Sequence, residues 1–164
     1  MADIVIKNSA VYAARYQLRL AERLGFGIHG IVHVVEDKIK GDQSAIKAHR
    51  SAEAYFRERR VYERLKQGGF TEILGFHVPR LIRADDDLWV VEMTIVTRPF
   101  VLDFAGAYLD EPPEFAESIW ADWEAEKREQ FGARWRRVQA VMGALEELGI
   151  HMLDVSPSNI GFLD

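Results

Sequence analysis

The first half of the chain alternates between apolar and polar positions with a period of two, which predicts strands. Tyr16, Leu18 and Leu20, for example, are separated by polar or small residues. Three strands are predicted before the first helix, at 15–24, 31–35 and 44–48. Residues 1–14 are weakly patterned, so they predict no more than a short additional element.

The period then changes to that of a helix. Tyr55, Val61, Tyr62 and Leu65 lie at helical spacings, which predicts a helix that starts at Ser51 or Ala52 and ends at Gln67. Two glycines follow it, and glycine commonly ends a helix. Two further strands are predicted at 78–82 and 88–93, joined by a turn at 84–87.

The last third of the chain is mainly helical in pattern. From Pro112 onwards Phe115, Ile119 and Trp123 lie four residues apart, which predicts one helix. A longer helix begins near Trp135 and ends before Gly149, and 151–159 is a polar loop. Because the predicted strands precede these helices rather than alternating with them, the fold class is α+β and not a parallel βαβ sheet.

Composition limits the kind of protein without identifying it. The 164 residues are 48% hydrophobic and 29% charged, with a net charge of -5, as in an ordinary globular domain. The charge does not favour nucleic-acid binding. The chain has no cysteine, which excludes disulfides and thiolate metal sites. Neither a signal peptide nor a membrane span is evident, so we expect a cytoplasmic protein that does not enter a membrane.

A glycine-rich segment joins the first two predicted strands. Gly25, Gly27 and Gly30 form the pattern G-x-G-x-x-G, and Val32 follows two residues later. Glycines let a backbone approach phosphate groups closely. In a dinucleotide-binding fold a helix would follow this pattern, whereas here a strand follows, so a Rossmann-type dehydrogenase is disfavoured.

Two further segments carry charged or polar residues in apolar surroundings. Lys47 follows Ala45-Ile46 on the third predicted strand, and the next helix offers Glu58 and Glu63 as partners. These two glutamates lie about 140° apart around a helix, so only one of them can face the lysine, and helix geometry alone leaves both open. Near the end of the chain, Asp154 and Asn159 stand in the pattern D-x-x-x-x-N.

The order of these motifs resembles the protein-kinase-like superfamily, in particular its atypical, RIO-type members and the aminoglycoside-phosphotransferase-like enzymes. The resemblance covers about residues 15–160. It implies a single kinase-like domain over 1–164, with an N-lobe at 15–95 and a minimal C-lobe at 96–164. The N-lobe would hold an antiparallel five-stranded sheet and one helix of the αC type. The C-lobe would be reduced and mostly helical.

The resemblance also implies roles for individual residues. The glycine loop and Lys47 would bind the phosphates of ATP, with Glu58 holding the lysine. Asp154 would accept or orient the proton of a substrate hydroxyl, and Asn159 would bind Mg²⁺. The residues implied for the rest of the nucleotide site are Val32, Ala45, Val91 as gatekeeper, and the backbone near Glu92 and Thr94.

Departures from the family pattern make catalysis an open question. Met152-Leu153 replace the usual His-Arg before the aspartate, and Ser156 replaces a lysine. Five residues follow Asn159, so we expect no Asp-Phe-Gly metal motif, and Asp164 or a partner chain would have to supply that metal ligand. The alternative function is a catalytically inactive, pseudokinase-type interaction module, with a protein partner or a second copy of the chain covering the reduced C-lobe.

Overall fold

A computed structural model describes residues 3–164, which form two compact units. The first unit runs to Gly69 and includes Pro79–Ile95, and the second comprises Phe70–Val78 and Val96–Asp164. Residues 70–78 therefore group with the second half of the chain, although they lie between elements of the first unit in sequence.

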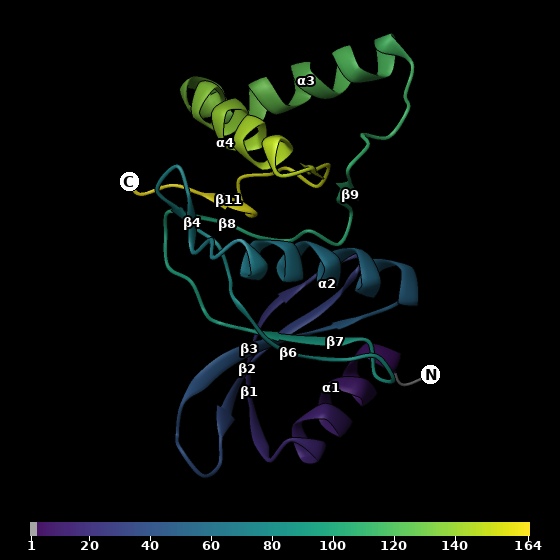
Figure 1. The fold of residues 1–164 in the computed structure, drawn as a ribbon, viewed down its shortest axis with the longest axis vertical. Helices are drawn as coiled ribbons and strands as arrows, with labels where there is room; N and C mark the ends of the chain where they lie inside the picture. Colours follow the sequence, from purple (N-terminus) through teal and green to yellow (C-terminus); the bar gives the residue numbers. More distant parts are fainter. Residues whose placement is uncertain (1–2) are drawn as a thin grey trace. The chain divides into compact units, whose positions relative to one another are not determined.

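The first unit is built on a five-stranded antiparallel sheet, as predicted, and the α+β class is confirmed. The strands lie in the order β1-β2-β3-β7-β6. Their bounds are Leu18–Phe26 for β1, Gly30–Asp37 for β2, Gln43–His49 for β3, Val90–Met93 for β7 and Leu81–Asp85 for β6. Figure 1 shows the helices α1 and α2 on opposite faces of this sheet.

Helix α2, Ala52–Gln67, has the bounds that the sequence predicts. Its N-terminus is capped by Ser51, whose side chain accepts a hydrogen bond from the Ala54 N–H at 3.2 Å. At the other end Gly69 has a φ of 72°, a left-handed conformation that glycine adopts without strain. The capping residues and the periodic apolar face thus indicate the same bounds for this helix.

Helix α1, Ile4–Arg15, is the main element that the sequence did not predict. The residues that it buries have helical spacing, but Asn8 and Ser9 are among them, which weakens the apolar pattern. Both are satisfied, because Asn8 Nδ2 donates to the Leu88 carbonyl at 2.9 Å and Ser9 Oγ donates to the Val5 carbonyl at 2.7 Å. The predicted first strand consequently begins at Leu18 rather than residue 15.

Two buried carboxylates attach α1 and the chain after it to the sheet. The Tyr12 hydroxyl donates to Glu92 Oε2 at 2.8 Å, beneath the helix. Arg15 and Tyr16 each contact Asp85 Oδ2 at 2.7 Å. This face of the sheet is also the centre of an apolar core, formed by Val5, Tyr12, Ala13, Leu18, Ile31, Val35, Ile46, Ala48, Leu88 and Val90.

The fourth and fifth predicted strands both begin later in the sequence than predicted. The strand predicted at 78–82 forms as β6 at Leu81–Asp85, and the one predicted at 88–93 forms as β7 at Val90–Met93. Val78 and Leu88 are apolar because they are buried, although they lie outside these strands, and their apolar character therefore misled the prediction of the strand ends. Asp85 belongs to β6 because it pairs with Val90 in the ladder, and its carboxylate contacts Arg15 and Tyr16.

The second unit combines helices with short strands. Helices α3, Glu117–Phe131, and α4, Trp135–Glu147, are joined by the 3₁₀ helix η1, Gly132–Arg134. The predicted helix therefore begins at Glu117 and not at Pro112. Gly149 follows α4 with a φ of 77°, as the predicted helix end requires.

The short strands of the second unit form two small sheets. One has the order β11-β8-β5-β4, with bounds Ile160–Gly161, Phe100–Val101, Phe76–His77 and Glu72–Ile73. In the other, β10, Ile150–His151, pairs with β9, Tyr108–Leu109. The first residue of the loop predicted at 151–159, His151, is thus the last residue of β10. Across residues 3–164 no helix has the length and apolar character that crossing a membrane requires.

Candidate functional site

The predicted nucleotide-site residues of the first unit form a row across the sheet. In the antiparallel register Gly25 pairs with Val32, Val32 with Lys47, and Lys47 with Val91. Residues paired in this way point to the same face, and neighbouring strands lie about 4.8 Å apart. Ala45 lies two positions from Lys47 on β3, so its side chain is on that face as well.

Lys47 forms a buried ion pair with Glu58. Lys47 Nζ lies 2.8 Å from Glu58 Oε1, and the exposed fractions of the two side chains are 7% and 0%. The rival glutamate, Glu63, contacts Arg59 at 2.7 Å one helical turn away, and its side chain is 37% exposed. The structure therefore distinguishes the two glutamates that the sequence left open, and pairs Lys47 with Glu58.

His49 is a second partner of Glu58, which sequence reasoning missed. Its Nε2 lies 2.7 Å from Glu58 Oε1 and its Nδ1 lies 3.0 Å from the Trp89 carbonyl oxygen. The available signal was its position two residues after Lys47 on a strand, which places both side chains on one face.

The charges of this buried cluster favour an ionised Glu58. Burial by itself raises the pKa of Glu58, but the Lys47 ammonium and the hydrogen bond from His49 outweigh it and hold the pKa well below its usual range. The Lys47 ammonium therefore has an ionised partner in this buried cluster.

The three glycines of the β1–β2 loop differ in what the fold requires of them. A Cβ at Gly30 would lie 2.1 Å from the Ala48 carbonyl oxygen on the neighbouring strand, so packing alone explains this glycine. A Cβ at Gly25 or Gly27 would meet nothing within 4 Å, and neither has a positive φ. Folding therefore leaves Gly25 and Gly27 unexplained, whereas close approach of a ligand would explain them.

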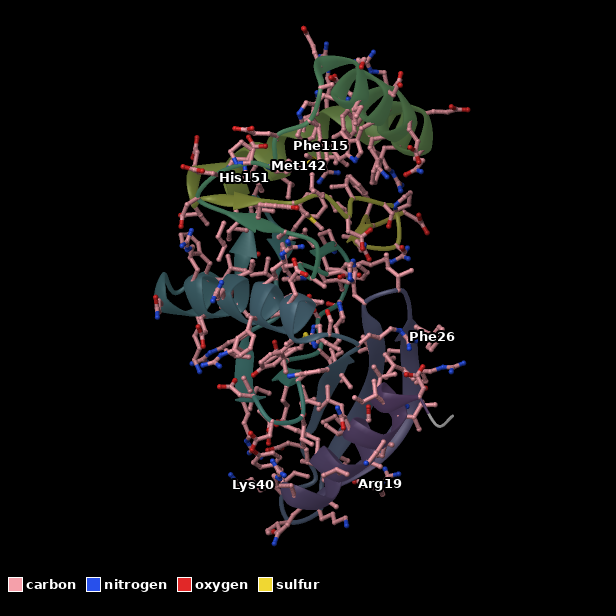
Figure 2. All side chains as sticks on the ribbon, turned by 90° about the vertical axis from the view of Figure 1, so that its right-hand side faces the viewer. Arg19, Phe26, Lys40, Phe115, Met142 and His151 are labelled. Carbon is pink, nitrogen blue, oxygen red and sulfur yellow. The ribbon has the colours of Figure 1, made fainter. Side chains whose placement is uncertain are left out.

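The loop itself is open to solvent. The Gly27 N–H donates to the Gly30 carbonyl oxygen at 3.0 Å and closes the hairpin. Phe26 and Ile28 have exposed fractions of 61% and 82%. Figure 2 shows Phe26 at this end of the unit and Lys40, in the β2–β3 turn, at the opposite end.

The predicted adenine contacts lie at the end of β7. Val91 is fully buried in the row described above, whereas Glu92 turns its side chain to the other face, toward Tyr12 and Ser44. The Thr94 N–H donates to the Arg80 carbonyl oxygen at 2.9 Å. An adenine hydrogen bond to this N–H would therefore replace an existing one.

The D-x-x-x-x-N motif forms a compact loop in the second unit. Asn159 is buried, and its Nδ2 donates to the Asp154 carbonyl oxygen at 3.0 Å. The Asn159 carbonyl in turn accepts from the Leu102 N–H at 2.9 Å, which ties the loop to the chain after β8. Because the amide nitrogen is engaged, Oδ1 is the atom of Asn159 that would bind a cation.

Asp164 lies in different surroundings. Its side chain is 93% exposed and Oδ1 lies 3.7 Å from an Arg134 guanidinium nitrogen, so its nearest charge is positive. Within the part of the chain that the structure describes, no three His, Asp or Glu side chains are grouped as a metal site.

The site residues thus fall into two groups, one in each unit. Lys47, Glu58 and the glycine loop occupy the first unit, and Asp154 with Asn159 occupies the second. The first group holds a buried ion pair beside an open loop, and in the second the Asn159 side chain is hydrogen-bonded to the Asp154 main-chain carbonyl. Comparisons with protein-family models, with curated proteins and with solved structures find no match to this chain.

Proposed function

We propose that the chain binds ATP through its first unit. The observation that carries the proposal is the buried Lys47–Glu58 pair in the same strand register as a glycine loop whose Gly25 and Gly27 the fold does not need. The loop N–H groups and the Lys47 ammonium would bind the phosphates. Val32, Ala45 and Val91 would lie against the base, with backbone hydrogen bonds near Glu92 and Thr94.

The same proposal extends to phosphoryl transfer onto a hydroxyl group. Asp154 would accept the hydroxyl proton and Asn159 would bind Mg²⁺, which neutralises charge on the phosphates. The hydrogen bond from Asn159 to the Asp154 carbonyl supports this assignment, because it fixes the two residues relative to each other. A kinase-like fold would account for both groups of residues.

ATP binding is tested by the thermal stability of the protein. Millimolar ATP with Mg²⁺ should raise the midpoint of the wild type by several degrees, because a ligand that binds only the folded state stabilises it. Lys47→Ala should lose most of this ligand-induced shift. Lys40→Ala removes an exposed lysine and should keep it. The absence of a shift in the wild type would refute nucleotide binding.

Transfer is tested separately, by phosphate release or transfer from labelled ATP. Asp154→Asn should abolish turnover while the ATP-induced thermal shift persists. Glu147→Gln is the matched variant and should keep turnover, because it removes an exposed carboxylate that has no role in the proposal. Equal turnover of Asp154→Asn and the wild type would exclude Asp154 as the proton acceptor.

A second candidate is a nucleotide-binding interaction module that does not transfer phosphate. It is favoured by the surroundings of Asp164, which is exposed beside an arginine, and by exposed apolar residues of the second unit such as Phe115 and Ile119. A protein partner or a second copy of the chain would cover these residues. An ATP-induced thermal shift without any turnover would support this candidate over the enzyme.

A further inference from the structure

Three of the four tryptophans line one open groove in the second unit, between α3 and α4. Trp120 and Trp123 come from α3, and Trp135 and Met142 come from α4. The groove has a volume of 240 Å³, which is enough for a small organic group but not for a folded segment. Figure 1 shows the two helices side by side, and Figure 2 labels Met142 on this part of the unit.

The aromatic rings form a connected wall. The centroid of Trp123 lies 5.9 Å from that of Trp120 and 6.3 Å from that of Trp135, and both pairs meet edge to face. Phe115 extends the row, with its centroid 5.4 Å from Trp120. Edge-to-face packing fixes the rings at angles to one another, so several ring faces can surround one ligand.

Two carboxylates line this groove together with the rings, those of Glu124 and Glu146, and Glu124 pairs with Arg128 at 3.0 Å. Glu146 is exposed and forms no ion pair within residues 3–164. A cation already contacts one of the rings, because Lys127 Nζ lies 5.9 Å from the Trp123 ring centroid.

Trp135 adds an unsatisfied polar group. It is 5% exposed, and its buried Nε1–H has no hydrogen-bond partner within the described chain. Leaving such a donor unpaired costs about 1–3 kcal/mol. A quaternary nitrogen has no lone pair, so an oxygen elsewhere in a ligand, such as a hydroxyl, is what would accept from this N–H.

We propose that this groove binds a quaternary ammonium group. Tryptophan faces attract a cation through the ring quadrupole, the methyl groups of such a cation fill apolar space, and Glu146 supplies the opposite charge. A neutral apolar ligand would gain nothing from the carboxylate, and a primary ammonium would lose more hydration. The group could belong to a free small molecule or to a trimethylated lysine side chain, which share this chemistry.

The test follows tryptophan fluorescence, since three of the four tryptophans line the groove. Choline should quench or shift the emission saturably. Its neutral carbon isostere, 3,3-dimethylbutan-1-ol, has the same shape and should bind about tenfold more weakly. Equal binding of the two would overturn the proposal, as would the absence of a saturable response to choline.

Variants locate the response on the intact chain. Trp120→Leu should weaken choline binding about tenfold. Glu146→Gln alters an exposed residue and should weaken it about threefold, whereas its neighbour Glu147→Gln should leave it unchanged. Choline binding that survives both Trp120→Leu and Glu146→Gln would place any site elsewhere and overturn the assignment.

A second pair of probes distinguishes a free small molecule from a trimethylated lysine side chain as the ligand. A short peptide with trimethyl-lysine is compared with the same peptide carrying unmodified lysine. Preference for the methylated peptide over choline would identify a protein ligand, and the reverse order would identify a small molecule. Neither result depends on ATP, so the groove and the nucleotide proposal can fail independently.

Discussion

At the scale of single residues, Glu58 is the side chain on which most of the buried charge depends. One of its oxygens accepts from both Lys47 and His49, at 2.8 and 2.7 Å. Glu63, five residues later on the same helix, contacts Arg59 at the surface. The two glutamates are therefore a matched pair for measuring the cost of losing a buried or an exposed carboxylate.

Glu58→Gln should be strongly destabilising. It leaves the Lys47 ammonium buried without its counter-charge, and breaking a buried ion pair in this way costs about 3–5 kcal/mol. Glu63→Gln should cost less than about 0.5 kcal/mol, because it removes an exposed pair within one helix. Urea unfolding measures both free energies, and equal losses would show that the Glu58 pair does not hold α2 to the sheet.

Acid should weaken the protein through the same carboxylate and through Asp85. Burial raises the pKa of Asp85, but hydrogen bonds from Tyr16 and Arg15 outweigh it, so its pKa is lowered, as is that of Glu58. A carboxylate with a lowered folded-state pKa stabilises the fold above its ordinary pKa of about 4 and loses this contribution as the pH falls further.

The free energy of unfolding should therefore decrease from about pH 5 downwards. Urea unfolding at a series of pH values measures this slope. Asp85→Asn should flatten it. An identical slope for Asp85→Asn and the wild type would contradict the role assigned to Asp85.

At this scale the sequence predicted some contacts and not others. Lys47 and Glu58 could be paired because a motif and a helical phase both constrained them. His49 could not, because a histidine on a strand has many uses and its two partners, Glu58 and Trp89, come from separate parts of the chain. The polar contacts of Asp85 were likewise hidden, since they depend on a helix that the pattern did not reveal.

At the scale of elements, α2 and α1 show what sequence patterns can predict. Helix α2 has a capping serine, a periodic apolar face and terminal glycines, so its bounds follow from local chemistry. Helix α1 buries Asn8 and Ser9, while Ile4 and Ile6 are exposed, so its outward and inward faces look alike in hydropathy. Tertiary hydrogen bonds decide its position, and a sequence pattern does not contain them.

The glycine loop gives a prediction about one element. Gly30→Ala should cost about 1–3 kcal/mol, because the new methyl group collides with the Ala48 carbonyl and the strands must separate. Gly25→Ala and Gly27→Ala should be close to neutral, since open space surrounds both positions. Thermal or urea unfolding compares the three, and a large loss at Gly27 would mean that the fold itself needs that glycine.

At the scale of the whole molecule, the sequence predicted the α+β class and the five-stranded sheet, but not that residues 70–78 belong with the second unit. Strand alternation sufficed for the sheet of the first unit. In the second unit all six strands have two residues, too few to show a period, and their pairing joins distant segments such as β11 with β8. Residues 70–78 belong to the second unit because of that pairing, and no pattern in the sequence near them indicates it.

The double variant Gly25→Ala/Gly27→Ala tests the central claim most directly, because it should alter nucleotide binding without altering the fold. Calorimetric titration with ATP and Mg²⁺ compares it with the wild type, and urea unfolding checks that both are equally stable. The account predicts saturable ATP binding by the wild type and affinity at least about tenfold lower in the variant. Equal ATP affinity in two equally stable proteins, or no binding by the wild type, would contradict it.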